Sequence, residues 1–101
     1  MKRPSIVDLS GPMLRWIRER AGWTQTRFAQ ALARQKKYDG DFTSVSSIIR
    51  YEMRIIVTPV LANRYREVIG PELFDQLLRM YYQDVRDRIE RDRIERSKLK
   101  P

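Results

Sequence analysis

Residues that typically start or stop a helix divide this chain into short segments, and this pattern favours a fold made of helices over one that contains strands. Gly11-Pro12, Thr58-Pro59 and Pro71 are typical helix starts, because proline is tolerated in the first turn, where its missing N–H is no loss. Gly22 is typical of a left-handed C-terminal cap, and Gly70 ends the fourth segment. No segment has the alternating pattern of a strand. The sequence therefore predicts an all-α chain.

Apolar residues between these signals recur every three or four positions, as they do on one face of a helix. Five helices are expected: from Gly11-Pro12 to about residue 21, Gln25 to about Ala33, Val45 to about Met53, Pro59 to residue 69, and Pro71 to about residue 96. Thr24 is the expected N-cap of the second helix, and Thr43 or Ser44 that of the third. The second helix has Phe28, Ala29 and Leu32 on one face, and Ile48, Tyr51 and Ile55 are expected to face inward in the third. The apolar residues of the fourth helix are Val60, Leu61, Tyr65, Val68 and Ile69.

The composition restricts the chemistry that this chain can perform. A length of 101 residues with 42% hydrophobic side chains fits one soluble domain with a single core. The chain contains neither cysteine nor histidine, which removes disulfides, thiolate zinc sites, thiol nucleophiles and the commonest general base. Its acidic residues are too scattered for a metal or acid–base site. We expect no enzyme, no metal and no cofactor.

No apolar run is long enough for a membrane span, and the N-terminus lacks the apolar region of a signal peptide. A cytoplasmic protein without a membrane partner is therefore expected.

The positive charge is concentrated in the first two thirds of the chain. The formal charge is +8, and residues 1–66 hold 13 basic and 5 acidic side chains, whereas residues 67–101 hold 8 of each. Sixteen of the 21 basic residues are arginine, whose planar guanidinium suits phosphate and guanine edges. This distribution favours an acidic partner for the first two thirds. An inert basic surface is the alternative, and an anionic membrane surface is less favoured, because the N-terminal helices are short.

The order of elements around residues 14–52 is that of a helix-turn-helix. The string from Leu14 to Leu32, LRWIRERAGWTQTRFAQAL, closely resembles the opening of phage-repressor domains of the Xre/Cro type. The string SVSSIIRYE, residues 44–52, resembles the third helix of that family, and Thr58-Pro59 its fourth-helix start. The match covers residues 13–69. It implies a five-helix, repressor-like fold of bacterial, phage or plasmid origin that binds double-stranded DNA near the nucleoid.

One departure from the family lies between the second and third helices. Family members join them by about four residues, whereas Arg34–Phe42 is an insertion of about nine residues here. The insertion could lengthen the second helix or loop out toward DNA, so the docking angle stays open.

The resemblance also implies a set of DNA-contacting residues. Gln25 matches a residue that clamps the phosphate backbone, aided by the free N–H groups of its helix. Val45, Ser46 and Arg50 match base-reading positions, and Arg50 could donate to guanine O6 and N7. The remaining candidates for DNA contact are Thr24, Arg27, Lys36, Lys37, Ser44, Ser47, Ile49 and Arg54. Three of these assignments have an alternative: Gln25 could be a solvated residue of the first helical turn, Arg50 could bind phosphate or stay exposed, and Ile49 could lie at the edge of the core.

Two further roles follow from the resemblance and from the last helix. Arg18 and Glu52 match residues that pair between two helices, and exposed charges are the alternative. The fifth helix has a broad apolar face, and its candidate residues for a dimer interface are Leu78, Tyr81, Tyr82, Val85 and Ile89. If that face only completes its own core, the protein is a monomer. A duplicated pentad, DRIER, covers residues 87–96 and favours a solvated helix through (i, i+4) ion pairs.

The sequence therefore predicts a 1–12 arm, a 13–70 helix-turn-helix domain and a 71–101 amphipathic helix with a charged tail. The expected function is sequence-specific regulation of transcription by a homodimeric repressor. An antitoxin or adaptor that binds a second protein through the last helix is the alternative, and a binder of structured RNA is a third.

Overall fold

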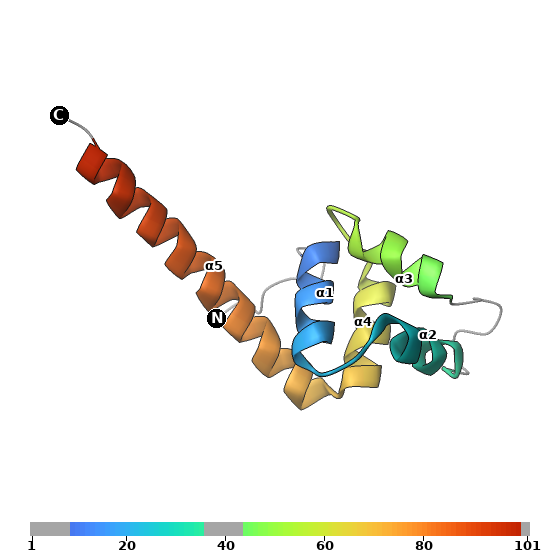
Figure 1. Cartoon of the computed structure of the whole chain (residues 1–101). Coiled ribbons are helices and arrows are strands. Elements are labelled where there is room, and N and C mark those ends of the chain that lie inside the picture. Colours follow the sequence, from blue (N-terminus) through green and yellow to red (C-terminus); the bar gives the residue numbers. More distant parts are fainter. Residues whose placement is uncertain (1–8, 36–43, 100–101) are drawn as a thin grey trace.

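The computed structural model describes residues 9–35 and 44–99, which form five α-helices and no strand (Figure 1). The helices are α1 (Gly11–Arg20), α2 (Gln25–Ala33), α3 (Val45–Glu52), α4 (Pro59–Ile69) and α5 (Pro71–Leu99). The predicted all-α class and the long C-terminal helix are confirmed, and α5 ends three residues later than expected. Lys36, Lys37, Thr43, the rest of the insertion to Phe42 and the arm up to residue 8 lie outside the described residues.

Four of the helices begin at a hydroxyl-bearing N-cap. The side chains of Ser10, Thr24, Ser44 and Thr58 each accept a hydrogen bond from the backbone N–H three residues later, over 3.2–3.3 Å. Each bond satisfies one of the N–H groups that a helix leaves unpaired at its start. These local contacts fix where α1 to α4 begin.

The tight connection between α1 and α2 uses the expected glycine. Gly22 has a φ of 87°, the left-handed conformation that side chains disfavour. The N–H of Trp23 then donates to the carbonyl of Arg18 over 3.1 Å, and the Trp23 ring meets Phe28 edge-on at 5.6 Å. The turn therefore closes the end of α1 and sets the direction of α2.

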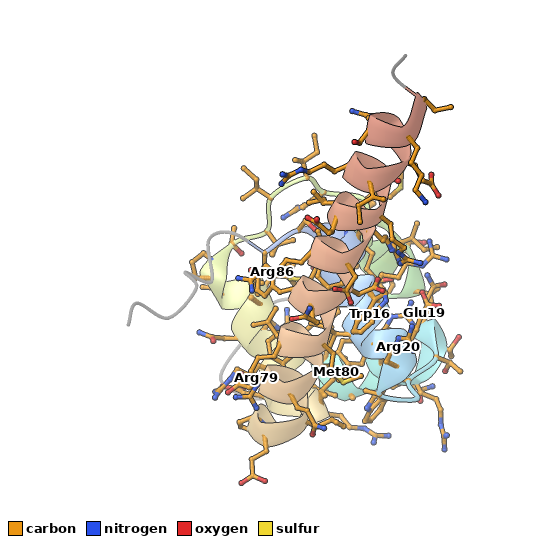
Figure 2. The ribbon with its side chains drawn as sticks, turned by 90° about the vertical axis from the view of Figure 1, so that its left-hand side faces the viewer. Trp16, Glu19, Arg20, Arg79, Met80 and Arg86 are labelled. Atoms are coloured by element: carbon orange, nitrogen blue, oxygen red, sulfur yellow. The ribbon has the colours of Figure 1, made fainter. Side chains whose placement is uncertain are left out.

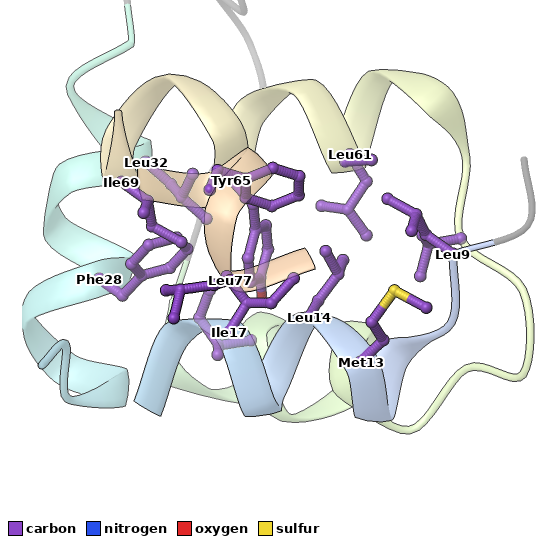
Figure 3. Packing of buried hydrophobic residues seen from close by; sticks show 14 of the residues in the cluster. Leu9, Met13, Leu14, Ile17, Phe28, Leu32, Leu61, Tyr65, Ile69 and Leu77 are labelled. Atoms are coloured by element: carbon purple, nitrogen blue, oxygen red, sulfur yellow. The ribbon is translucent and has the colours of Figure 1, made fainter. Parts of the chain in front are cut away.

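One core holds all five helices together (Figure 3). Leu14, Ile17, Phe28 and Tyr65 are fully buried, and the rings of Phe28 and Tyr65 lie 4.5 Å apart. Leu9 is also buried, so the packed body begins before the domain boundary expected at residue 13. The first part of α5 shares this core through side chains that include Phe74 and Leu77.

The fifth helix packs on α1 along its first half and then projects into solvent (Figure 1). Figure 2 shows Trp16 and Arg20 of α1 beside α5; the Trp16 and Tyr81 rings meet edge-on at 5.4 Å, and the Arg20 guanidinium lies 4.4 Å from the Trp16 ring. Every residue from 86 to 99 is exposed. An (i, i+4) ion pair forms between Asp84 and Arg88 at 2.7 Å.

The turn between α3 and α4 is tied to the first residue of α1 and to a residue just before that helix. Gly11 N–H donates to the Arg54 carbonyl at 2.7 Å, and Val57 N–H donates to the Leu9 carbonyl at 3.1 Å. Val57 occupies the core, whereas Ile55 is 87% exposed. The prediction that Ile55 faces inward is therefore wrong, because the two backbone anchors turn the residues between them outward.

A buried arginine fixes the end of α2. Arg64 of α4 is 3% exposed and donates to the Leu32 carbonyl at 2.9 Å and to the Gln35 side chain at 3.0 Å. The Gln35 amide in turn donates to the Arg64 carbonyl at 3.0 Å. The Leu32 carbonyl also accepts from the Gln35 backbone N–H at 3.1 Å, and together these bonds hold the chain where it leaves α2.

Candidate nucleic-acid interface

The outer face of α3 carries four exposed side chains in helical register. Ser46, Ile49, Arg50 and Met53 are all exposed, and their spacing of three and four residues places them on one side of the helix. Ser46, Ile49 and Arg50 were predicted for this face. Met53 was missed, although its position four residues after Ile49 is the signal that could have found it. The face combines one hydroxyl, one guanidinium and two apolar groups.

Two other predicted groove-facing residues point elsewhere. Ser47 is 5% exposed, and its hydroxyl lies 3.2 Å from that of Ser44, so the structure does not present this predicted DNA contact on the outer face. It lies on the side of α3 that packs against the body, where its backbone N–H also binds the Ser44 cap. Val45 is half-buried and packs against the core, so it lies at the edge of the outer face rather than on it.

A buried ion pair holds α3 against α1. Arg18 Nε lies 2.7 Å from Glu52 Oε2 and Arg18 Nη2 lies 2.9 Å from Oε1, with the two side chains 5% and 3% exposed. This is the pair that the family resemblance implied for Arg18 and Glu52. Arg18 also donates to the Trp23 carbonyl at 2.7 Å, and the Tyr65 hydroxyl donates to Glu52 Oε2 at 2.9 Å. The network joins α1, α3 and α4 behind the outer face of α3.

The network changes the proton affinity of its members. Burial disfavours the charge of Arg18, but the hydrogen bond and the charge of Glu52 outweigh this, so the pKa of Arg18 is raised above its ordinary value. Burial, and then the charge and hydrogen bond of Glu52, raise the pKa of Tyr65 well above its ordinary value. Both residues therefore keep their protons throughout the neutral range.

The raised pKa of Tyr65 predicts a loss of stability in alkali. Above about pH 10 the phenol ionises in the unfolded chain but stays protonated in the folded one. The free energy of unfolding should then fall by about 1.4 kcal/mol per pH unit from this residue alone. Urea unfolding between about pH 8 and pH 11 measures the slope, and Tyr65→Phe should reduce it. An equal slope in both proteins would contradict the assignment.

The start of α2 lies beside an open groove lined by Trp23, Thr24, Gln25 and the ion pair of Arg15 with Glu19, among others. Thr24 is exposed, but its hydroxyl caps α2 by accepting from the backbone of Arg27, so it is engaged within its own helix. Gln25 is half-buried, and the Arg27 side chain is exposed. This helix start therefore presents backbone N–H groups with an amide and a guanidinium nearby, which suits an anion.

Arg54 is exposed just after α3, with its guanidinium 5.4 Å from the Tyr51 ring. A cation over an aromatic ring gains about 0.5–1 kcal/mol at an exposed site, enough to bias its position. Arg54 thus extends the cationic surface of Arg50 beyond the end of the helix.

Most of the residues predicted for a dimer interface are partly covered by the chain's own domain. Leu78, Tyr81 and Tyr82 are half-buried against the core, and Val85 is also half-buried. Ile89, at 62% exposure, is the member of the predicted set that stays exposed. The expected apolar stripe on α5 is thus largely covered by its own domain.

Among the described residues, no group of three or more acidic side chains could hold a metal ion. None of the described helices combines the length and the hydrophobicity that crossing a membrane requires. Comparisons with protein-family models, curated proteins and solved structures found no match.

Proposed function

We propose that this chain is a sequence-specific regulator of transcription that binds double-stranded DNA as a homodimeric repressor, with α3 in the major groove. The observation that carries the proposal is the outer face of α3, where Ser46, Ile49, Arg50 and Met53 are exposed together. The one acidic residue of α3, Glu52, is buried and neutralised by Arg18, so no carboxylate on the helix would repel phosphate.

The chemistry of this face matches the base edges of a major groove. A guanidinium such as that of Arg50 can donate two hydrogen bonds to guanine, and Ser46 can bind several bases. Ile49 and Met53 are apolar groups that thymine methyls would cover, which gives a reason for their exposure next to charged residues. The face can therefore distinguish base pairs by both hydrogen bonding and apolar contact.

The surrounding charges supply the contacts that hold a reading helix on the duplex. The start of α2 presents N–H groups beside Gln25 and Arg27, and Arg54 lies beyond the far end of α3. Such contacts to phosphate position a protein but carry no sequence information. Together with the charge of +8, they support a salt-dependent affinity for nucleic acid.

Selection of bound duplexes from a random pool tests the proposal. The expected result is one enriched motif, with affinity for that motif well above affinity for unrelated duplex at the same salt concentration. Structured RNA of equal length serves as the competitor. Failure to enrich any motif, or equal competition by the RNA, would overturn sequence-specific DNA binding.

Arg50→Ala should weaken binding to the selected duplex by about 1–3 kcal/mol while changing affinity for unrelated duplex far less. The physical reason is that a base contact carries sequence preference, whereas a phosphate contact does not. Fluorescence anisotropy with both duplexes measures the two affinities. Arg86→Ala, which removes an arginine that is also exposed and lies on α5, is the matched control and should preserve the ratio. A uniform loss for Arg50→Ala would reassign the residue to phosphate.

The projecting half of α5 supports a second candidate function, that of an antitoxin or adaptor that binds another protein. Residues 86–99 form an exposed helix beyond the packed body. A stoichiometric partner that co-purifies with the full chain but not with a chain ending at residue 85 would support this function.

A further inference from the structure

Two isoleucines, together called the isoleucine tip, protrude from the turn that follows α3. Ile55 is 87% exposed and Ile56 is 66% exposed. With Met53 at 75%, they are three of the four most exposed large apolar side chains in the described part of the chain. All three lie within four consecutive residues, and the fourth of these, Arg54, is exposed as well. Single apolar side chains on a surface are normal, but a cluster of them typically marks a contact site.

The backbone holds the isoleucine tip in place. The two residues lie between Arg54, whose carbonyl accepts from the Gly11 N–H, and Val57, whose N–H donates to the Leu9 carbonyl. Val57 is 1% exposed and belongs to the core, which fixes the turn from within. The tip therefore has its position before a partner arrives, and this lowers the entropy cost of a contact.

The charges around the tip indicate what kind of partner can cover it. Arg50 and Arg54 are exposed beside it along the chain, and Glu52, the one carboxylate of α3, is buried in its ion pair. No acidic residue follows before Glu67. A second copy of the chain would bring these arginines against one another, whereas a polyanion is attracted to them. The charge therefore favours nucleic acid over a second copy.

The size of the tip leads to the same partner. The two exposed fractions amount to about one and a half fully exposed isoleucine side chains, whereas an ordinary protein–protein interface takes about 20–30 residues a side. The tip instead continues a larger surface. Figure 1 shows α3 and the turn after it along the same edge of the packed body, and Met53 belongs to the outer face of α3. A contact that only extends a surface already held on its partner needs little area of its own.

We propose that the isoleucine tip is a second contact with duplex DNA, made by apolar packing against deoxyribose beyond the end of α3. It rests on the proposed function and deepens it by adding an element outside the base-reading face. Thymine methyls lie in the major groove, where α3 reads, so the sugars are the apolar surface that the duplex offers next to its phosphates. In this arrangement Arg54 meets a phosphate, and the neighbouring isoleucines meet the adjacent sugars. Such contacts fix the register of a protein on the duplex and carry no sequence information.

An apolar contact and a charged contact respond differently to salt. Each phosphate that a cation neutralises releases counterions, so the logarithm of the affinity falls with the logarithm of the salt concentration by about 0.9 per contact. Burial of an isoleucine releases no counterion. Loss of the tip should therefore lower the affinity without changing this salt slope, whereas Arg54→Ala should reduce the slope by about 1.

Fluorescence anisotropy with duplexes of about ten base pairs tests the proposal, because this length is one half-site and is too short to place two copies side by side. I55S/I56S should bind roughly tenfold more weakly than the original chain, the effect of losing cover over about half of the exposed isoleucine surface. The loss should be equal on the selected and on an unrelated duplex. I55L/I56L keeps the apolar surface and should bind like the original chain.

Two controls separate this contact from a general loss of structure or of apolar surface. I94S/L99S removes two exposed apolar residues of α5 and should bind duplex like the original chain. Circular dichroism should show unchanged helicity in every variant, because all of the substituted side chains are exposed.

Photo-cross-linking provides a measurement that does not depend on affinity lost in a serine variant. Because the chain has no cysteine, I56C introduces a unique thiol that can carry an aryl azide. Irradiation with duplex present should attach this variant to DNA far more than L99C, which carries the same label at the end of α5.

Four results would overturn the contact: unchanged affinity of I55S/I56S, a loss confined to the selected duplex, a salt slope lowered as in Arg54→Ala, or a lower mass of I55S/I56S than of the original chain in sedimentation without DNA. The last result would assign the tip to a second copy. Unchanged affinity of I55S/I56S would leave the proposed function standing. A chain that binds duplex without a preferred motif would overturn sequence-specific binding while leaving this contact intact.

Discussion

Replacement of Glu52 by alanine should lower the free energy of unfolding by about 3–5 kcal/mol. The change removes both carboxylate oxygens that bind the Arg18 guanidinium and the acceptor of the Tyr65 hydroxyl. Arg18 would keep its charge in a site where its side chain is 5% exposed, with the Trp23 carbonyl as its remaining partner among these contacts. An unpaired buried charge is among the most costly defects that a single substitution can create. Urea unfolding followed by tryptophan fluorescence measures the loss.

Two further variants distinguish the buried pair from ionic pairing in general. Glu19→Ala breaks the exposed pair with Arg15, whose side chains are 63% and 54% exposed, and should cost no more than about 0.5 kcal/mol. The double variant R18M/E52L replaces both charges by apolar groups and should recover most of the stability lost in E52A. If E52A cost no more than E19A, the network would not be what holds α3 against α1.

Replacement of Gly11 by alanine should cost roughly 2–4 kcal/mol, although its backbone conformation suits any residue. An added Cβ would lie 2.6 Å from the Tyr51 carbonyl oxygen and 2.7 Å from that of Arg54, both backbone atoms that cannot simply rotate away. The end of α3 must then shift, and the hydrogen bond from Gly11 N–H to Arg54 is strained or lost. Thermal and urea unfolding measure the change.

Gly22→Ala is the matched control for the effect of an added methyl group. Gly22 has a φ of 87° with no atom within 4 Å of the added Cβ, so alanine there costs about 1–2 kcal/mol through backbone strain alone. Gly11→Ala should therefore be the more damaging of the two. The opposite order would show that α1 and the end of α3 can separate without loss.

Elements set by local contacts could be predicted from the sequence. Each of the caps Thr24, Ser44 and Thr58 bonds to a backbone group three residues away, so its signal lies within one short stretch. The left-handed Gly22 is local in the same sense. The pairing of Arg18 with Glu52, by contrast, joins residues 34 positions apart and came from the family resemblance, not from spacing.

Sequence patterns gave the wrong orientation, or no prediction, for residues at which segments far apart in the chain meet. Ile55 was expected inside because it is apolar, but the bonds from Gly11 and Val57 decide its direction, and no periodicity reveals them. Arg64 was not singled out, because a charged residue in a helix usually faces solvent, and only the end of α2 explains its burial. Met53 is a different case, because it lies four residues after Ile49, and continuing that helical spacing past the end of α3 would have predicted it on the outer face.

The clamp between Arg64 and Gln35 bears on how far this fold tolerates changes in length. The chain is fixed at Gln35 by α4, and it is fixed again at Ser44, which caps α3. When both ends of a connection are set independently, doubling the number of residues between them costs only about 0.6 kcal/mol of closure entropy. The contacts at Gln35 and Ser44 therefore set the orientation of α3, so a change in the number of residues between these two points should leave that orientation undisturbed.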